Sequence, residues 1–201
     1  MVAKSDIANL VISGAAENDI KALIKADLSI LAKYLDYDKS GNYICFSEFP
    51  IGLTSEKIDF VVFAGRSRME VYLFEAKGAE FNQVNQSVKD GPFHATYMNV
   101  LDQLVRRKRF IIDKYSVFRE HVHSIRDIVE NRRPGWKNYN SFTGPTPLKG
   151  IVDSEKDISV KYIAIGGKTV NDKIESHKRH AWETAMTDFK LESWDSWLNK
   201  V

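Results

Sequence analysis

The chain has 201 residues, of which 43% are hydrophobic and 28% charged, a balance typical of one folded domain over residues 1–201. Its single cysteine, Cys45, excludes an internal disulfide and a cysteine-based zinc cluster. The net charge of +2 does not by itself indicate that the protein binds nucleic acid. No apolar run is as long as a membrane span, and the N-terminal residues make a poor signal peptide. A cytoplasmic location without membrane contact is therefore the default expectation.

The first part of the chain predicts one amphipathic helix over residues 14–36. Its apolar residues recur at helical spacing and are Ile20, Leu23, Ile24, Leu28, Leu31 and Leu35. Ser13 is the candidate N-cap. Glu17 lies on or near the apolar stripe, where it is either a site residue or an acid that suits the positive end of the helix dipole.

A strand over 42–49 and a β-hairpin over 57–77 follow, and both arms of the hairpin carry an acid among apolar residues. Asp59 directly follows Ile58, and Glu75 directly follows Phe74. A partly buried carboxylate must be paired, protonated or bound to a metal, because desolvating it alone costs too much. The acids therefore mark a candidate site.

The pairing register of this hairpin decides whether the two acids meet. If Ala64 pairs with Glu70, Asp59 falls opposite Glu75 with Cβ atoms roughly 5 Å apart, and Lys77 points to the same side as Glu75. Facing carboxylates repel unless a cation lies between them, and Mg²⁺ needs few protein ligands. A one-residue shift would move Asp59 to the other face. The alternative is a solvated strand end where Lys77 pairs with Glu75.

Two helical segments are expected next, a polar one over 80–90 and a long one over 93–128. The long helix carries a polar stripe of Asn99, Gln103, Arg106 and Arg107. Lys and Arg outnumber Asp and Glu by ten to five over residues 101–140. This excess is either a solvated surface or a set of phosphate contacts.

Residues 132–158 show no periodicity, and a loop of this length is usually functional or disordered. Its cations alternate with aromatic residues, as nucleic-acid contacts often do, or these aromatics pack locally. A strand over 160–165, a helix over 171–188, a short strand over 191–194 and a terminal turn over 195–200 complete the order. This order predicts an α/β fold with a mixed central sheet flanked by helices.

The order and the acidic residues resemble the PD-(D/E)xK nuclease superfamily, whose restriction-endonuclease-like core is αβββαβ. More narrowly, the chain resembles the Shedu antiviral nuclease domain over most of residues 14–198. The segments that carry this resemblance include "SEFPIGLTSEKIDFVVF", "VYLFEAKGAE", "YIAIGG" and "LESWDSWL". The proline that usually precedes the first acid is replaced here by Ile58.

The resemblance implies a Mg²⁺-dependent endodeoxyribonuclease of anti-phage defence, with Mn²⁺ as a substitute metal. Asp59 and Glu75 would hold the metal, and Glu17 matches a further ligand of some members. Lys77 would orient or deprotonate the attacking water. Gln103 matches the glutamine of a Q-x-x-x-Y helix, although position 107 is Arg rather than Tyr.

The expected partner is double-stranded DNA read through its backbone, and the resemblance also implies a homo-oligomer. The candidate phosphate contacts are Arg106, Arg107, Arg132, Arg133 and Lys137. The competing interpretation is a catalytically silent nuclease-fold protein that binds nucleic acid or regulates a partner.

Overall fold

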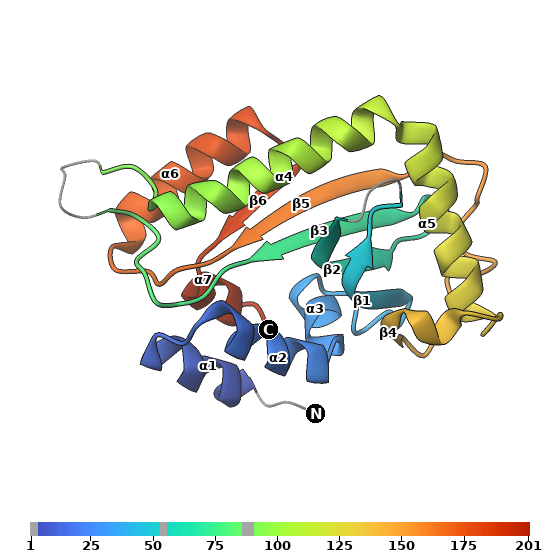
Figure 1. Cartoon of the computed structure of the whole chain (residues 1–201), viewed down its shortest axis with the longest axis horizontal. Coiled ribbons are helices and arrows are strands. Elements are labelled where there is room, and N and C mark those ends of the chain that lie inside the picture. Colours follow the sequence, from blue (N-terminus) through green and yellow to red (C-terminus); the bar gives the residue numbers. More distant parts are fainter. Residues whose placement is uncertain (1–3, 53–55, 86–90) are drawn as a thin grey trace. The chain divides into compact units, whose positions relative to one another are not determined.

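One mixed six-stranded sheet runs through the fold in the computed structural model, which describes residues 4–52, 56–85 and 91–201 (Figure 1). The strand order is β4-β1-β2-β3-β5-β6. β1 pairs antiparallel with both β2 and β4, β2 pairs antiparallel with β3, and β5 pairs parallel with β6. The predicted α/β class, with a mixed sheet flanked by helices, is confirmed.

The chain divides into two compact units. Residues 1–27, 75–106 and 162–201 form the first, which we call the terminal unit. It contains α1 (Lys4–Ser13), α2 (Glu17–Ala26), most of α4 (Ala95–Asp113), the end of β5 (Ser159–Ile165), α6 (Asp172–Ala185), β6 (Phe189–Glu192) and α7 (Trp194–Leu198). Within it, α1 packs against α2 and α7, and α6 packs against β6.

Residues 28–74 and 107–161 form the second unit, which we call the hairpin unit. It contains α3 (Ser29–Tyr34), β1 (Tyr43–Pro50), β2 (Lys57–Ala64), most of β3 (Glu70–Ala76), α5 (Tyr115–Glu130), the 3₁₀ helix η1 (Trp136–Asn138) and β4 (Asn140–Thr143). Its core includes Phe46, Phe49 and Phe63, whose ring centroids lie 4.8–5.5 Å apart. The predicted hairpin therefore lies on a well-packed aromatic core.

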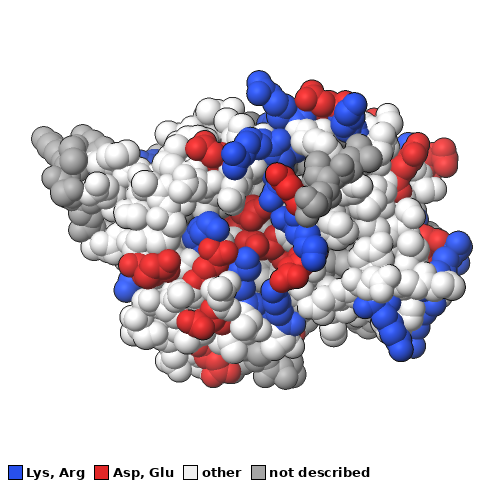
Figure 2. Space-filling view, viewed as in Figure 1, with Lys and Arg blue, Asp and Glu red and all other residues white. Residues whose placement is uncertain are grey.

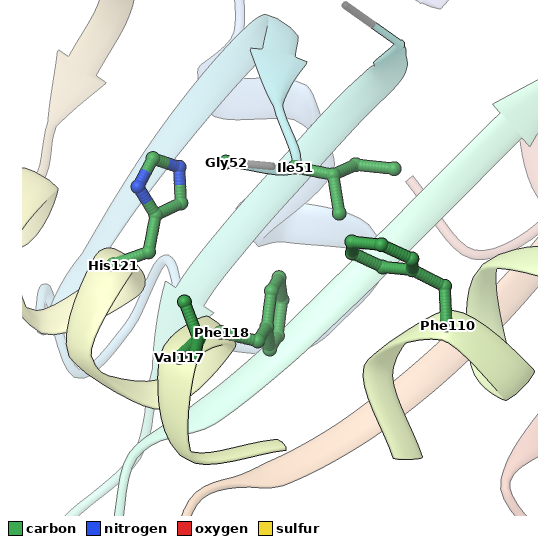
Figure 3. A pocket seen from close by; sticks show the side chains of 6 residues that line it. All are labelled: Ile51, Gly52, Phe110, Val117, Phe118 and His121. Atoms are coloured by element: carbon green, nitrogen blue, oxygen red, sulfur yellow. The ribbon is translucent and has the colours of Figure 1, made fainter. Parts of the chain in front are cut away.

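A small cavity of about 80 Å³ lies beside α5 in the hairpin unit. Figure 3 shows its lining side chains, which are Ile51, Gly52, Phe110, Val117, Phe118 and His121. A ring nitrogen of His121 hydrogen-bonds the Pro50 carbonyl oxygen at 3.0 Å. A Cβ atom at Gly52 would lie 2.9 Å from this imidazole, so the glycine lets the end of β1 approach α5.

The predicted helix over 14–36 is wrong, because three helices occupy residues 4–34. Gly14 adopts the left-handed conformation with φ 71° and ends α1. Ser13 is not an N-cap, since its hydroxyl donates to the Leu10 carbonyl oxygen within α1. Ala16 takes the N-cap position of α2 without a side-chain hydrogen bond.

Three further expectations are corrected. Residues 80–85 are not helical but form isolated bridges, and residues 86–90 of that prediction lie outside the described part. The helix over 93–128 breaks at Lys114, where the chain turns from α4 into α5 (Figure 1). The segment 132–158 is not wholly irregular, because it contains η1 and β4.

The end of the chain is more regular than predicted. β6 takes the place of the short strand over 191–194, and α7 replaces the terminal turn. Among the residues that the structure describes, no helix is long and apolar enough to cross a bilayer.

Candidate functional site

The register of the β2–β3 hairpin is the one that the predicted site requires. Ala64 pairs with Glu70, and the ladder continues to the pair Phe60 and Phe74. Asp59 directly precedes Phe60 in the chain, and Glu75 directly follows Phe74. The loop between the strands therefore has odd length, and the predicted register is confirmed up to the pair next to the two acids.

The burial of these acids differs. Glu75 is 5% exposed at the end of β3, whereas Asp59 is half-buried near the start of β2. The neighbours of Glu75, Phe74 and Ala76, are buried as well. A carboxylate in such surroundings must be compensated by hydrogen bonds or positive charge. Glu75 is therefore buried in the protein, and the end of β3 is not solvated at this residue.

Lys77, two residues further on, forms an ion pair with the first residue of α2. Its ammonium nitrogen lies 2.9 Å from Glu17 Oε2, and the ammonium nitrogen of Lys21 lies 3.0 Å from Glu17 Oε1. Burial alone would raise the pKa of Glu17, but the hydrogen bonds and charges of Lys77 and Lys21 outweigh it and lower the pKa. Glu17 is therefore an anion shared by two lysines.

Gly78 allows this approach of α2 to β3. A Cβ atom at Gly78 would lie 2.7 Å from the Glu17 backbone nitrogen, closer than real Cβ contacts come. The Ala79 amide next to it donates to the Ala15 carbonyl oxygen at 2.9 Å. The backbone beyond Lys77 is thus joined directly to the turn before α2, which brings Glu17 to the lysine.

Lys21 is a site residue that the sequence argument missed. It lies four residues after Glu17, one helical turn on, and Glu before Lys at this spacing is a recognised stabilising pair. The signal was therefore present in the sequence. The helix dipole explains an acid at the first residue of α2, but the Lys21 ammonium on the same face of the helix also stabilises Glu17.

Gln103 lies half-buried on α4. Within the described residues, its amide makes no hydrogen bond to Glu17 or Lys77. The structure therefore brings Glu17 and Lys77 together and leaves Gln103 outside their ion-pair network. No group of three or more His, Cys, Asp or Glu side chains in the described ranges is arranged to hold a metal ion.

The candidate phosphate contacts fall into two classes. Arg107 forms an ion pair with Glu56 and donates to the Lys57 carbonyl oxygen at 3.0 Å, and Arg133 Nε lies 2.8 Å from Asp127 Oδ2. The other three are Arg106, Arg132 and Lys137, which are exposed, as Arg133 also is. The first class is already engaged by the protein, and the second is available to a ligand.

Trp136 lies between two of the exposed cations in the sequence and contacts both. The guanidinium carbon of Arg132 is 5.7 Å from the centre of its ring, and the ammonium of Lys137 is 5.9 Å from it. Such cation–π contacts hold cations at the surface without neutralising them. Figure 2 shows Lys and Arg side chains gathered where α5 gives way to η1, while acids and bases are interspersed elsewhere on the face shown.

Comparison with protein-family models gives a match to the family described as Shedu protein SduA, C-terminal, over residues 14–198. The chain belongs to this family. The matched range contains Glu17, the β2–β3 hairpin, Gln103 and α7. Membership associates the protein with Shedu antiviral defence. Comparison with individually curated proteins gave no match.

Proposed function

We propose that this Shedu domain is a Mg²⁺-dependent endodeoxyribonuclease that acts in anti-phage defence. The observation that carries the proposal is the β2–β3 register, which pairs Ala64 with Glu70 and leads directly to Asp59 on one strand and Glu75 on the other. Family membership supports the defence role, and the charged residues support the chemistry.

The donor set fits a hard divalent cation. Asp59 and Glu75 would supply carboxylate oxygens, and Mg²⁺ is commonly bound through one or two carboxylates while it keeps several waters. Such an ion lowers the pKa of a bound water and stabilises charge on the phosphate. The buried position of Glu75 provides the low-polarity surroundings in which this charge compensation is strong.

Lys77 follows Glu75 by two residues and is the proposed source of positive charge for the reaction. Its ammonium is held by Glu17 at 2.9 Å, and its side chain is 23% exposed, so it is both oriented and reachable from solvent. In the proposed reaction the ammonium neutralises charge on the phosphate and orients the attacking water. Glu17 orients Lys77, and Gln103 is proposed to contact substrate from α4.

The exposed cations Arg106, Arg132 and Lys137 are proposed to contact DNA phosphates. Phosphate contacts position a protein on DNA without reading its sequence. Contacts of this kind support cleavage or nicking that depends on the geometry of the DNA backbone and not on the base sequence.

The test is nicking of a supercoiled plasmid in Mg²⁺ by the wild type and by Glu75→Gln and Lys77→Met. We expect both variants to lose at least about 100-fold in rate, the scale seen when one preorganised charged group is removed from an active site. Glu70→Gln, which removes a carboxylate from the start of the same strand, is the matched control. Equal rates for wild type, Glu75→Gln and Lys77→Met would refute the assignment.

A further inference from the structure

The backbone of Lys77 is held on both sides by the C-terminal part of the terminal unit. The Lys77 amide donates to the Ile165 carbonyl oxygen at 2.9 Å. The indole nitrogen of Trp194, at the start of α7, donates to the Lys77 carbonyl oxygen at 2.7 Å. Both peptide groups of the lysine are therefore fixed, one by β5 and the other by a side chain from a helix 117 residues away in the sequence.

A second link joins the same segments through Gly167. The Trp194 amide donates to the Gly167 carbonyl oxygen, and the Gly167 amide donates to the Gly78 carbonyl oxygen, each at 3.0 Å. Trp194 is fully buried. The Trp194 indole thus hydrogen-bonds Lys77 directly, and the Trp194 backbone is linked to Gly78 through Gly167.

The residues around Trp194 fix the orientation of α7. Ser193 and Ser196 form a reciprocal capping box at the helix start. The Asp195 carboxylate accepts the Thr169 amide at 2.6 Å. Glu192, which is 2% exposed, accepts the Ser196 hydroxyl at 2.5 Å. A short helix with this many polar anchors presents its first side chain in one direction.

We propose that Trp194 is a positioning residue for Lys77, so that the start of α7 serves to set the place of the lysine in the proposed active site. This inference rests on the proposed nuclease function. Lysine has a long flexible side chain, and a small displacement of its backbone is carried to the ammonium group. Reactions that depend on a charged group at a defined place are sensitive to errors of about 1 Å.

The experiment compares Trp194→Phe with the matched control Trp197→Phe in the full chain. Trp197 is also fully buried, lies in the same helix and packs edge-to-face against Trp194 with centroids 5.6 Å apart. Both variants lose an indole from the same core. We expect only Trp194→Phe to speed amide hydrogen exchange in a peptide covering residues 76–80, because only this variant removes the donor to the Lys77 carbonyl.

Single-turnover cleavage then tests the consequence, well below the melting temperature of each variant. We expect Trp194→Phe to lower the maximal rate about tenfold or more with an unchanged KM for DNA, whereas Trp197→Phe stays near the wild-type rate. Replacing Trp194 by benzothienylalanine, which keeps the ring shape and has sulfur in place of the N–H, covers the case in which the phenylalanine variant does not fold.

The outcomes separate the two proposals. If the wild type cleaves DNA and the Trp194 and Trp197 variants show equal rates and equal hydrogen exchange, the proposed role of Trp194 is refuted. A loss that appears in KM alone also overturns it, because positioning of Lys77 acts on the bound complex. A wild type that does not cleave refutes the nuclease proposal, and the exchange measurement still reports whether Trp194 holds Lys77.

Discussion

At the scale of single residues, the Glu17 carboxylate is bound at both oxygens, by Lys77 and by Lys21. A metal bound by Glu17 would have to share these oxygens with the two ammonium groups. The low pKa of Glu17 means that its pairing stabilises the fold at neutral pH. This contribution is lost as pH falls through the lowered pKa, because the unfolded state then binds more protons than the folded one.

We therefore expect Glu17→Gln to lower the nicking rate about tenfold while the Mg²⁺ concentration for half-maximal activity stays unchanged. The rate falls because the Lys77 ammonium loses its anionic partner, and a charge-assisted hydrogen bond contributes about 1.5–3 kcal/mol. The measurement is a Mg²⁺ titration of plasmid nicking. Asp19→Asn, an exposed acid in the same first turn of α2, is the control. A several-fold higher Mg²⁺ requirement in Glu17→Gln alone would make Glu17 a ligand instead.

The burial of a charged residue was predictable where its cause is local. Glu75 could be found because an acid among apolar neighbours needs compensation, and Glu75 is indeed buried. The contact of Trp194 with Lys77 could not be found, because the two residues lie 117 positions apart in the sequence and meet only in the folded structure. Sequence spacing carries no information on such a contact.

At the scale of elements, the hairpin was predictable and the helices only in part. The β2–β3 register follows from strand alternation on both sides of a short loop, and it was confirmed. The break at Asp27 was missed, because buried residues keep helical spacing across it, as Ile24, Leu28 and Leu31 do. Helix α1, which ends just before Gly14, was not predicted. β4 was missed because its mostly polar sequence becomes a strand only by pairing with β1.

The hairpin loop depends on Gly65, and we expect Gly65→Ala to destabilise the protein by about 2–3 kcal/mol. Gly65 has φ 105°, and an added Cβ would lie 2.6 Å from the Arg68 carbonyl oxygen. The substitution therefore combines backbone strain with a clash against backbone. Urea denaturation followed by circular dichroism measures the loss.

Gly150→Ala is the matched control for this change. Gly150 also has positive φ, at 83°, but an added Cβ there meets nothing within 4 Å. It carries the strain alone, for which we expect about 1 kcal/mol. Equal losses in the two variants would show that the Gly65 loop can shift to relieve the clash, and the hairpin register would then not depend on this glycine.

At the scale of the whole molecule, the net charge of +2 understates the charge available to DNA. Arg107 and Arg133 are paired with acids of the protein, whereas Arg132 and Lys137 are exposed beside Trp136. A count of charged residues along the sequence could not separate these classes, because it does not show that Glu56 pairs with Arg107 and Asp127 with Arg133. Affinity for DNA should therefore depend on particular cations more than on total charge.

This distinction predicts a specific salt dependence. Each cation that neutralises a phosphate contributes about 0.9 to the slope of log K against log salt, because it releases condensed counterions. We expect Arg132→Gln with Lys137→Gln to reduce the slope for duplex DNA by about 1.8 and to weaken binding to all sequences alike. The measurement is fluorescence anisotropy over a series of salt concentrations, in Ca²⁺ so that cleavage does not interfere.

Lys33→Gln with Lys39→Gln removes the same net charge from exposed positions in and after α3 and should leave the slope within about 0.5 of the wild type. Equal reductions in both double variants would mean that DNA responds to the total charge of the protein, and the contact at Trp136 would then have no separate role.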